Sequence, residues 1–158
     1  GARSVMADFA QLDLKAASEE GSWLHLEHDG EPMFLDDDAE RPEKPQRIHI
    51  KGMADPKVMA ACRAVTRTQT LMQDRLARSS EKDAEGVVKK FEAKLEDAMS
   101  DMIVAACDDW ENITWAGEAL EFNRENLLKI CGSGTLFFKQ VTDAIQEHKR
   151  LFTNAASA

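Results

Sequence analysis

The chain has 158 residues, of which 43% are hydrophobic and 31% are charged, and this composition is typical of one ordinary globular domain. Its net charge of -9 argues against nucleic-acid binding unless its 20 Lys and Arg residues gather on one face, because a protein that follows phosphates needs a basic surface. No apolar run reaches the roughly 18 residues of a membrane span, and the chain begins without a signal-peptide pattern. We therefore expect neither nucleic acid nor membrane among its partners.

The sequence predicts an α+β fold that is mostly helical, with a small N-terminal antiparallel β-hairpin or sheet followed by about four α-helices. We expect residues 1–20 to form an N-terminal arm, within which residues 1–5 look like a cloning remnant. Residues 21–152 should form a single α+β domain. Residues 153–158 are expected to be a flexible tail.

The sheet is predicted within residues 22–52. Residues 22–28 alternate between two faces, as a half-buried strand does. Asp29-Gly30 follows, and this dipeptide between apolar runs is a strong signal for a two-residue hairpin. Residues 33–35 would form the returning strand, and the alternating residues 46–51 a third strand.

Helices are predicted within residues 55–152, with Asp55 and Asn123 as N-caps and Pro56 in the first helical position. Apolar side chains recur at steps of three and four along each predicted helix. The first helix has Val58, Cys62, Val65, Met72 and Leu76 at this spacing, with the polar Gln69 in the same row. The second has Val87, Phe91, Leu95, Met99, Met102, Ile103, Ala106 and Trp110. The third is predicted over residues 123–131, and the fourth has Phe137, Val141, Ile145 and Phe152, with His148 in the same row.

The four histidines give no strong metal-site pattern. His25 and His28 are expected on opposite faces of a strand, so they cannot share one ion. His25 and His49 could meet across the sheet, but two histidines without a third ligand make a poor zinc site. His148 is expected at the edge of the last helix's apolar face. We predict no bound metal or other cofactor.

Other candidate chemical motifs also favour structural roles. Asp36-Asp37-Asp38 lacks the ligand spacing of a calcium loop, and Gly132-Ser133-Gly134 lacks the Lys and preceding strand of a phosphate-binding loop. Cys62, Cys107 and Cys131 form no metal-binding or redox pair, and we expect all three to be buried free thiols. No catalytic residue is assigned, and the chain is predicted not to be an enzyme.

Binding to another protein is the remaining class of function. Two long amphipathic helices could leave a groove that accepts a partner helix, and flexible Met side chains suit such surfaces. The alternative is that these helices bury their apolar faces against each other. The candidate partner-binding residues are Met59, Met72, Met99, Met102 and Phe138.

Two stretches carry aromatic and glycine motifs that resemble a known family. The first holds a Gly-Ser-Trp-Leu-His-Leu run at residues 21–26 and extends to residue 52, and the second holds a Trp-Xaa-Gly turn and Phe-Xaa-Xaa-Glu-Asn-Leu-Leu within residues 113–128. Together they resemble the tail assembly chaperones of long-tailed, siphovirus-type bacteriophages or prophages. The matching positions, which we interpret as fold determinants, are Trp23, Gly30, Gly52, Trp115, Gly117, Phe122, Glu125, Asn126 and Leu127. We expect Trp115 and Phe122 to pin their turn to the core.

The resemblance implies a function in the cytoplasm of the bacterial host and absence from the mature virion. Such chaperones bind and solubilise the tape measure protein, and a longer frameshifted form is thought to recruit the tail tube protein. The alternatives are a structural head–tail connector or tail component, and an adaptor that binds a helix of another protein. Oligomeric state stays open.

Overall fold

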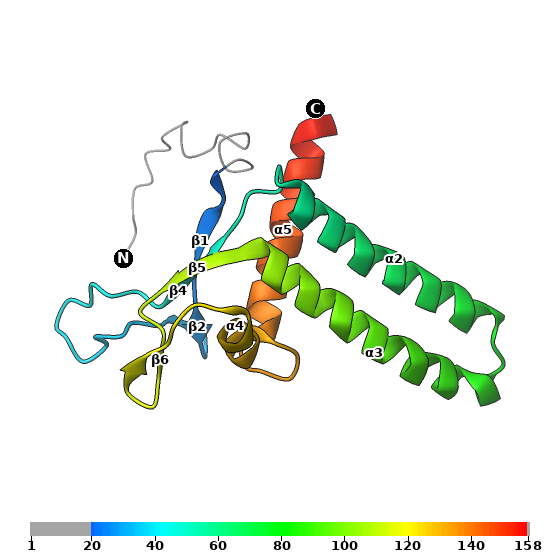
Figure 1. The fold of residues 1–158 in the computed structure, drawn as a ribbon, viewed down its shortest axis with the longest axis horizontal. Helices are drawn as coiled ribbons and strands as arrows, with labels where there is room; N and C mark the ends of the chain where they lie inside the picture. The colour runs from blue at the N-terminus through cyan, green and yellow to red at the C-terminus, as the bar shows by residue number, and fades with distance from the viewer. Residues whose placement is uncertain (1–19, 158) are drawn as a thin grey trace.

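The computed structural model describes the backbone of residues 20–157 and the side chains of residues 20–150. Four helices and seven short strands make up this described part, with the first strands preceding the helices (Figure 1). The predicted fold class, α+β and mostly helical, is confirmed. Apart from Glu20, the predicted N-terminal arm and the cloning remnant lie outside the described residues.

A three-stranded antiparallel sheet forms the centre of the fold. In spatial order its strands are β1 (Ser22–His25), β4 (Arg47–Ile50) and β5 (Cys107–Glu111). Alternate side chains of a strand point to opposite faces. Ile48 and Ile50 therefore enter the core and are fully buried, whereas Arg47 and His49 occupy the other face and stay partly exposed.

The second long helix is shorter than the sequence predicts. Helix α3 spans Glu81–Ala106, and the chain then passes directly into β5, so Trp110 lies on a strand opposite Ile48. The helical extension through Trp110 is therefore wrong. Asp108 and Asp109 would place negative charge at the negative end of the helix dipole, and pairing with β4 satisfies the backbone of this segment instead.

Two tight hairpins extend from the fold. The first pairs β2 (Glu27–His28) with β3 (Glu31–Pro32) around Asp29 and Gly30, whose φ angles are 52° and 79°. The predicted Asp-Gly turn is thus confirmed. The returning strand, however, is Glu31–Pro32 and not residues 33–35, of which Phe34 forms only an isolated bridge with Pro45.

The second hairpin pairs β6 (Thr114–Trp115) with β7 (Glu118–Ala119) around Ala116 and Gly117. Both turn residues have positive φ angles, 51° and 84°, as a turn between right-twisted strands requires. The sequence predicts the turn at Gly117 correctly.

Three of the helix boundaries follow from recognisable signals. Helix α2 (Pro56–Arg78) begins after Asp55, whose carboxylate accepts a 2.8 Å hydrogen bond from the backbone N–H of Lys57. Helix α4 (Arg124–Cys131) begins after Asn123, whose side-chain oxygen accepts from the N–H of Asn126 at 2.8 Å. Both predicted caps are confirmed. Helix α4 stops at Gly132, as expected.

The last helix, α5, spans Phe138–Ser157. Residues 153–157 are therefore helical, and the flexibility predicted for the tail from residue 153 stays a prediction. The Ala-rich composition of the segment, which suggested fraying, also has high intrinsic helix propensity.

The core lies between the inner face of the sheet and the helices. Its fully buried side chains come from β4, the first turns of α2, the end of α3, α4 and α5, and include Val58, Met102, Leu127, Val141 and Ile145. The three cysteines are buried and free, as predicted.

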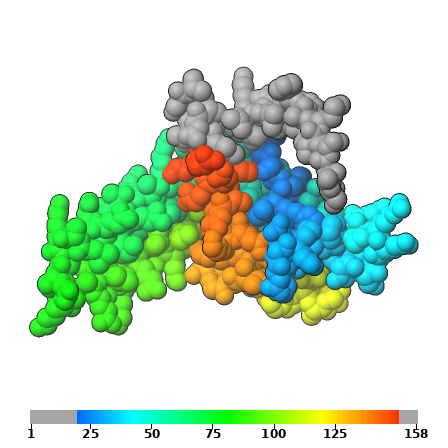
Figure 2. All heavy atoms as spheres, turned by 180° about the vertical axis from the view of Figure 1, so that it is seen from behind, coloured from blue at the N-terminus to red at the C-terminus, as the bar shows by residue number. Residues whose placement is uncertain are grey.

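Helices α2 and α3 form a long antiparallel hairpin that extends well beyond this core (Figure 1). No residue of α2 after Val65 is buried, and Phe91 is the first buried residue of α3. We call residues 66–90 the outer hairpin. Figure 2 shows it in green, projecting from one side of the molecule.

Candidate functional site

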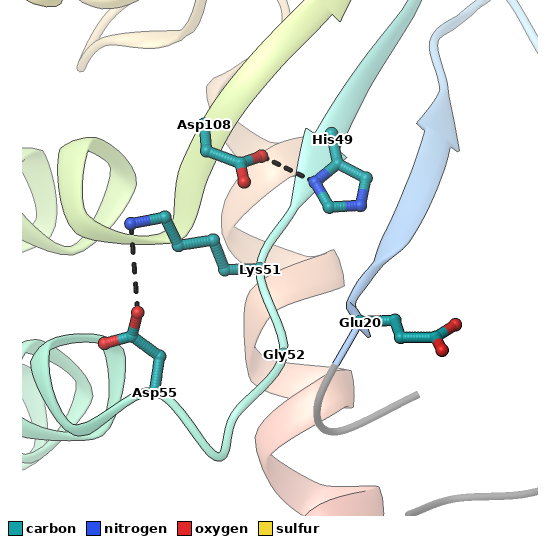
Figure 3. Close-up of a pocket in the computed structure, with 6 residues that line it drawn as sticks. All are labelled: Glu20, His49, Lys51, Gly52, Asp55 and Asp108. Carbon is teal, nitrogen blue, oxygen red and sulfur yellow. Dashed lines mark hydrogen bonds and ion pairs between the residues drawn. The ribbon is translucent and has the colours of Figure 1, made fainter. Parts of the chain in front are cut away.

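A polar hollow of about 220 Å³ lies where β4 ends, β5 begins and α2 begins (Figure 3). His49 Nδ1 lies 2.5 Å from Asp108 Oδ1, and Lys51 Nζ lies 3.9 Å from Asp55 Oδ2. Gly52 and Glu20 complete the lining, and the Glu20 side chain points away from His49. The His49–Asp108 contact joins β4 to β5, and the Lys51–Asp55 ion pair links the end of β4 to the start of α2.

The chemistry available in this hollow is limited. A histidine held by a carboxylate resembles two members of a catalytic triad, but the six lining residues include no Ser, Thr or Cys to serve as the nucleophile. Three carboxylates against one lysine also disfavour an anionic ligand. Within residues 20–150, no three His, Cys, Asp or Glu side chains are grouped closely enough to hold a metal ion. The hollow is therefore best explained as a structural junction.

The sequence allowed His25 and His49 to meet across the sheet, but they do not occupy paired positions. The strand register pairs His25 with Arg47 and Trp23 with His49. The Nε2–H of His25 donates a 2.7 Å hydrogen bond to the carbonyl of Met33, while His49 is held by Asp108.

On the same face of the sheet, Trp23 is part of a polar and aromatic layer. The Arg47 guanidinium lies 4.2 Å from the Trp23 ring centroid, and Arg47 also pairs with Glu111 at 2.8 Å. His49 contacts the indole edge-on, with the ring centroids 5.1 Å apart. Trp23 is thus held by neighbours on β4 and keeps 37% of its surface exposed.

A second, more apolar hollow of about 370 Å³ lies beside the β6–β7 hairpin, where Leu35 and Ile113 are among its lining residues. Its wall includes Trp110, whose Nε1–H donates to the carbonyl of Leu120 at 3.0 Å, and Phe122, which contacts Trp110 edge-on at 5.2 Å. These contacts fix both rings as parts of the fold.

The family-motif positions in the second stretch have mainly structural contacts. Phe122 packs against the core as expected, and Leu127 is buried. The side chain of Asn126 donates to the carbonyl of Glu121 at 2.9 Å, and Glu125 lies exposed in the first turn of α4.

Trp115 differs from expectation, because 49% of its surface is exposed and it does not pin the turn to the core. The ammonium of Lys129 lies 3.8 Å from its ring centroid, so the indole covers the α4 surface through a cation–π contact.

The five candidate partner-binding residues do not form one exposed groove. Met102 is fully buried at 0% exposure and cannot contact a partner. Met59, Met99 and Phe138 are partly buried and pack against the core, whereas Met72 lies half-buried in the outer hairpin.

The cysteines are poor candidates for nucleophilic chemistry. Burial raises the pKa of all three thiols, most strongly for Cys107, where Cys131 and Asp108 raise the pKa further. The pKa of Cys131 rises to about 12. All three thiols are therefore protonated at neutral pH and are weak nucleophiles.

Sequence reasoning missed two features of the molecule. Gly21 has a φ of 75°, and a Cβ there would lie 2.1 Å from the carbonyl oxygen of Ile50. Helix α2 carries five Lys and Arg residues but only one acidic residue, Asp74, within a chain of net charge -9. The charge contrast was readable from the sequence by counting charges per helix.

Comparisons with protein-family models, with curated proteins and with solved structures found no match to this chain. No helix in the described part of the chain combines the length and the apolar character needed to cross a membrane.

Proposed function

We propose that this chain is a phage tail assembly chaperone, a non-enzymatic protein that binds the helical tape measure protein and keeps it soluble. The observation that carries the proposal is the outer hairpin, two helices that project from the core with apolar side chains left accessible to a partner. The motifs at residues 21–52 and 113–128 support the same family. The host cytoplasm is the proposed site of action.

The burial pattern of the outer hairpin supports helix binding. Leu71 and Val88 are 50% and 42% exposed, and Met72, Leu76 and Val87 are only half-buried. Most helical stability in proteins comes from packing of an apolar face. A partner helix laid along the hairpin would supply such packing and cover apolar surface on both molecules.

A soluble complex follows from this arrangement. The tape measure helix would bury its apolar stripe against the outer hairpin, while the acidic body of the chaperone adds net negative charge to the complex. A longer frameshifted form would then bring tail tube subunits to the coated tape measure.

The test is co-expression with the protein encoded immediately downstream, followed by solubility and pull-down measurements. We expect a long helical protein that is insoluble alone and soluble in complex with this chain. Leu71→Asp and Val88→Asp should each reduce the soluble yield. Leu136→Asp is the matched control, because Leu136 is 63% exposed but lies between α4 and α5, outside the hairpin.

Failure of the downstream protein to become soluble would overturn the proposal. A ring of this chain retained in purified particles would indicate a head–tail connector instead, and a gene without phage structural neighbours would indicate a helix-binding adaptor.

A further inference from the structure

The side of α2 that faces away from the core is rich in arginine. Arg63, Arg67, Arg75 and Arg78 are all exposed, and we call them the arginine stripe. At 100° per residue they fall within one third of the helix circumference, opposite Val58, Cys62 and Val65, which are buried. The stripe therefore faces solvent along most of the helix.

The stripe forms no ion pair within the part of the chain whose side chains the structure describes. Asp74 is the single carboxylate of α2 and lies on the same side, so this side keeps a positive charge in an acidic protein. Exposed charges are screened beyond about 8 Å at physiological salt, so a partner at the stripe responds to the local arginines.

The exposed side chain of Leu71 makes this surface different from one that binds only anions. It lies on the same side of α2, between Arg67 and Arg75 in sequence, and half of its surface is exposed. A phosphate backbone offers nothing apolar to such a side chain, whereas an amphipathic helix with flanking carboxylates offers both kinds of contact.

We propose that the arginine stripe binds an acidic amphipathic helix of a partner protein, with Leu71 in the partner's apolar row and the arginines against its Asp and Glu side chains. Arginine suits this pairing because its planar guanidinium can bind a carboxylate through two hydrogen bonds. The stripe covers 15 residue steps from Arg63 to Arg78, which is roughly 22 Å of helix. This inference rests on the proposed function in taking the hairpin as the binding element, and it adds the charge of the helix that is bound.

The test uses the full chain and three labelled peptides of about 18 residues, enough to span the stripe. The first peptide has a leucine row flanked by Glu, the second has the same row flanked by Lys, and the third keeps Glu but has Gln in place of the leucines. A single-stranded DNA of similar length serves as a polyanion without an apolar row. Binding is measured by fluorescence anisotropy at low and physiological salt.

We expect only the first peptide to bind strongly, with affinity that falls as salt rises. The double variant Arg67→Glu/Arg75→Glu should weaken binding by about tenfold or more. The double variant Arg41→Glu/Lys44→Glu makes the same charge change at two exposed residues of the loop before β4, outside the hairpin, and should change affinity by less than about threefold. Arg67→Gln/Arg75→Gln, which removes charge without reversing it, should give an intermediate loss.

Other outcomes would overturn the inference. Equal binding of the Lys peptide would exclude charge selection, and equal binding of DNA would indicate a general polyanion surface. Self-association that is lost in Arg67→Glu/Arg75→Glu would identify a second copy as the occupant. If the double variant solubilises the downstream protein as well as the unchanged chain does, the inference fails while the chaperone function stands. If the Glu-flanked leucine peptide binds but the downstream protein is not solubilised, the chaperone function fails while the inference stands.

Discussion

At the scale of single residues, Gly21 shows how one missing side chain permits the sheet to form. Its positive φ is strained for any other L-residue, and an added Cβ would clash with backbone atoms of Ile50 and Gly52, which cannot move independently of β4. The residue precedes β1 directly, so the clash falls where the edge strand joins the central one.

We predict that Gly21→Ala lowers the free energy of unfolding by roughly 2 kcal/mol or more, measured by urea denaturation. Gly30→Ala is the matched control. Gly30 has a similar φ of 79° but nothing within 4 Å of its added Cβ, so only backbone strain of about 1 kcal/mol is expected. Equal losses in the two variants would show that the backbone near Ile50 yields to the methyl group.

The buried thiols give a second prediction at this scale. Burial raises their pKa above the usual value of 9.0, so the folded state favours the protonated thiol. The stability that the protonated thiols give the folded state is fully present below pH 9.0. It is lost as pH rises toward the folded pKa, which is about 12 for Cys131. The free energy of unfolding should therefore fall above pH 9.0.

Urea denaturation across this pH range tests the effect, with a slope that approaches about 1.4 kcal/mol per pH unit for each thiol. The absence of Tyr from the sequence removes the phenol titration that would otherwise overlap. In Cys131→Ala the fall with pH should be shallower. A pH dependence that is unchanged in this variant would show that another group is responsible.

At the scale of elements, the sequence predicts helix starts better than strand partners. Asp55 and Asn123 act on their own first turns, so local chemistry is sufficient to place α2 and α4. The sequence did not predict β5 because this segment forms a strand through pairing with β4, more than 55 residues earlier in the chain. The hydrophobic pattern of the segment itself gives no sign of that pairing.

The α2–α3 hairpin should not be uniformly stable along its length. Its inner part packs against the core, whereas the outer hairpin is supported mainly by contact between its own two helices. We predict that backbone amides in residues 66–90 exchange with deuterium through openings of much lower free energy than those in residues 96–106. Hydrogen exchange with mass spectrometry checks this, and equal protection at both ends of α3 would contradict it.

At the scale of the whole molecule, the sequence predicted what kind of element would form the candidate site, but not which of its residues would be exposed. Helix spacing correctly pointed to long amphipathic helices, but it could not tell Met102, which is buried, from Met72, which is half-buried in the outer hairpin. That difference depends on where the core ends. The arginine stripe depends on which side of α2 faces solvent, which only the packing of the body defines.

Shortening the hairpin separates folding from binding. We predict that removing residues 69–75 and 84–90, one heptad from each helix, keeps the helix contacts in phase and leaves the core intact. The melting temperature should stay within about 5 °C of the full chain. The shortened protein should nevertheless lose solubilisation of the downstream protein, because Leu71 and Val88 are gone.

If the shortened protein still solubilises the downstream protein fully, the binding surface lies on the body of the molecule and not on the outer hairpin. Loss of the cooperative thermal transition would show that the outer hairpin supports the core.

The direct passage from α3 into β5 has a mechanical consequence. The 26 residues of α3 form a lever of roughly 39 Å, and its inner end is joined to the sheet by a peptide bond without a loop between them. α2 is anchored at the same end through Asp55 and Lys51. A load applied at the tip of the hairpin therefore reaches the sheet as torque about the junction of α3 and β5.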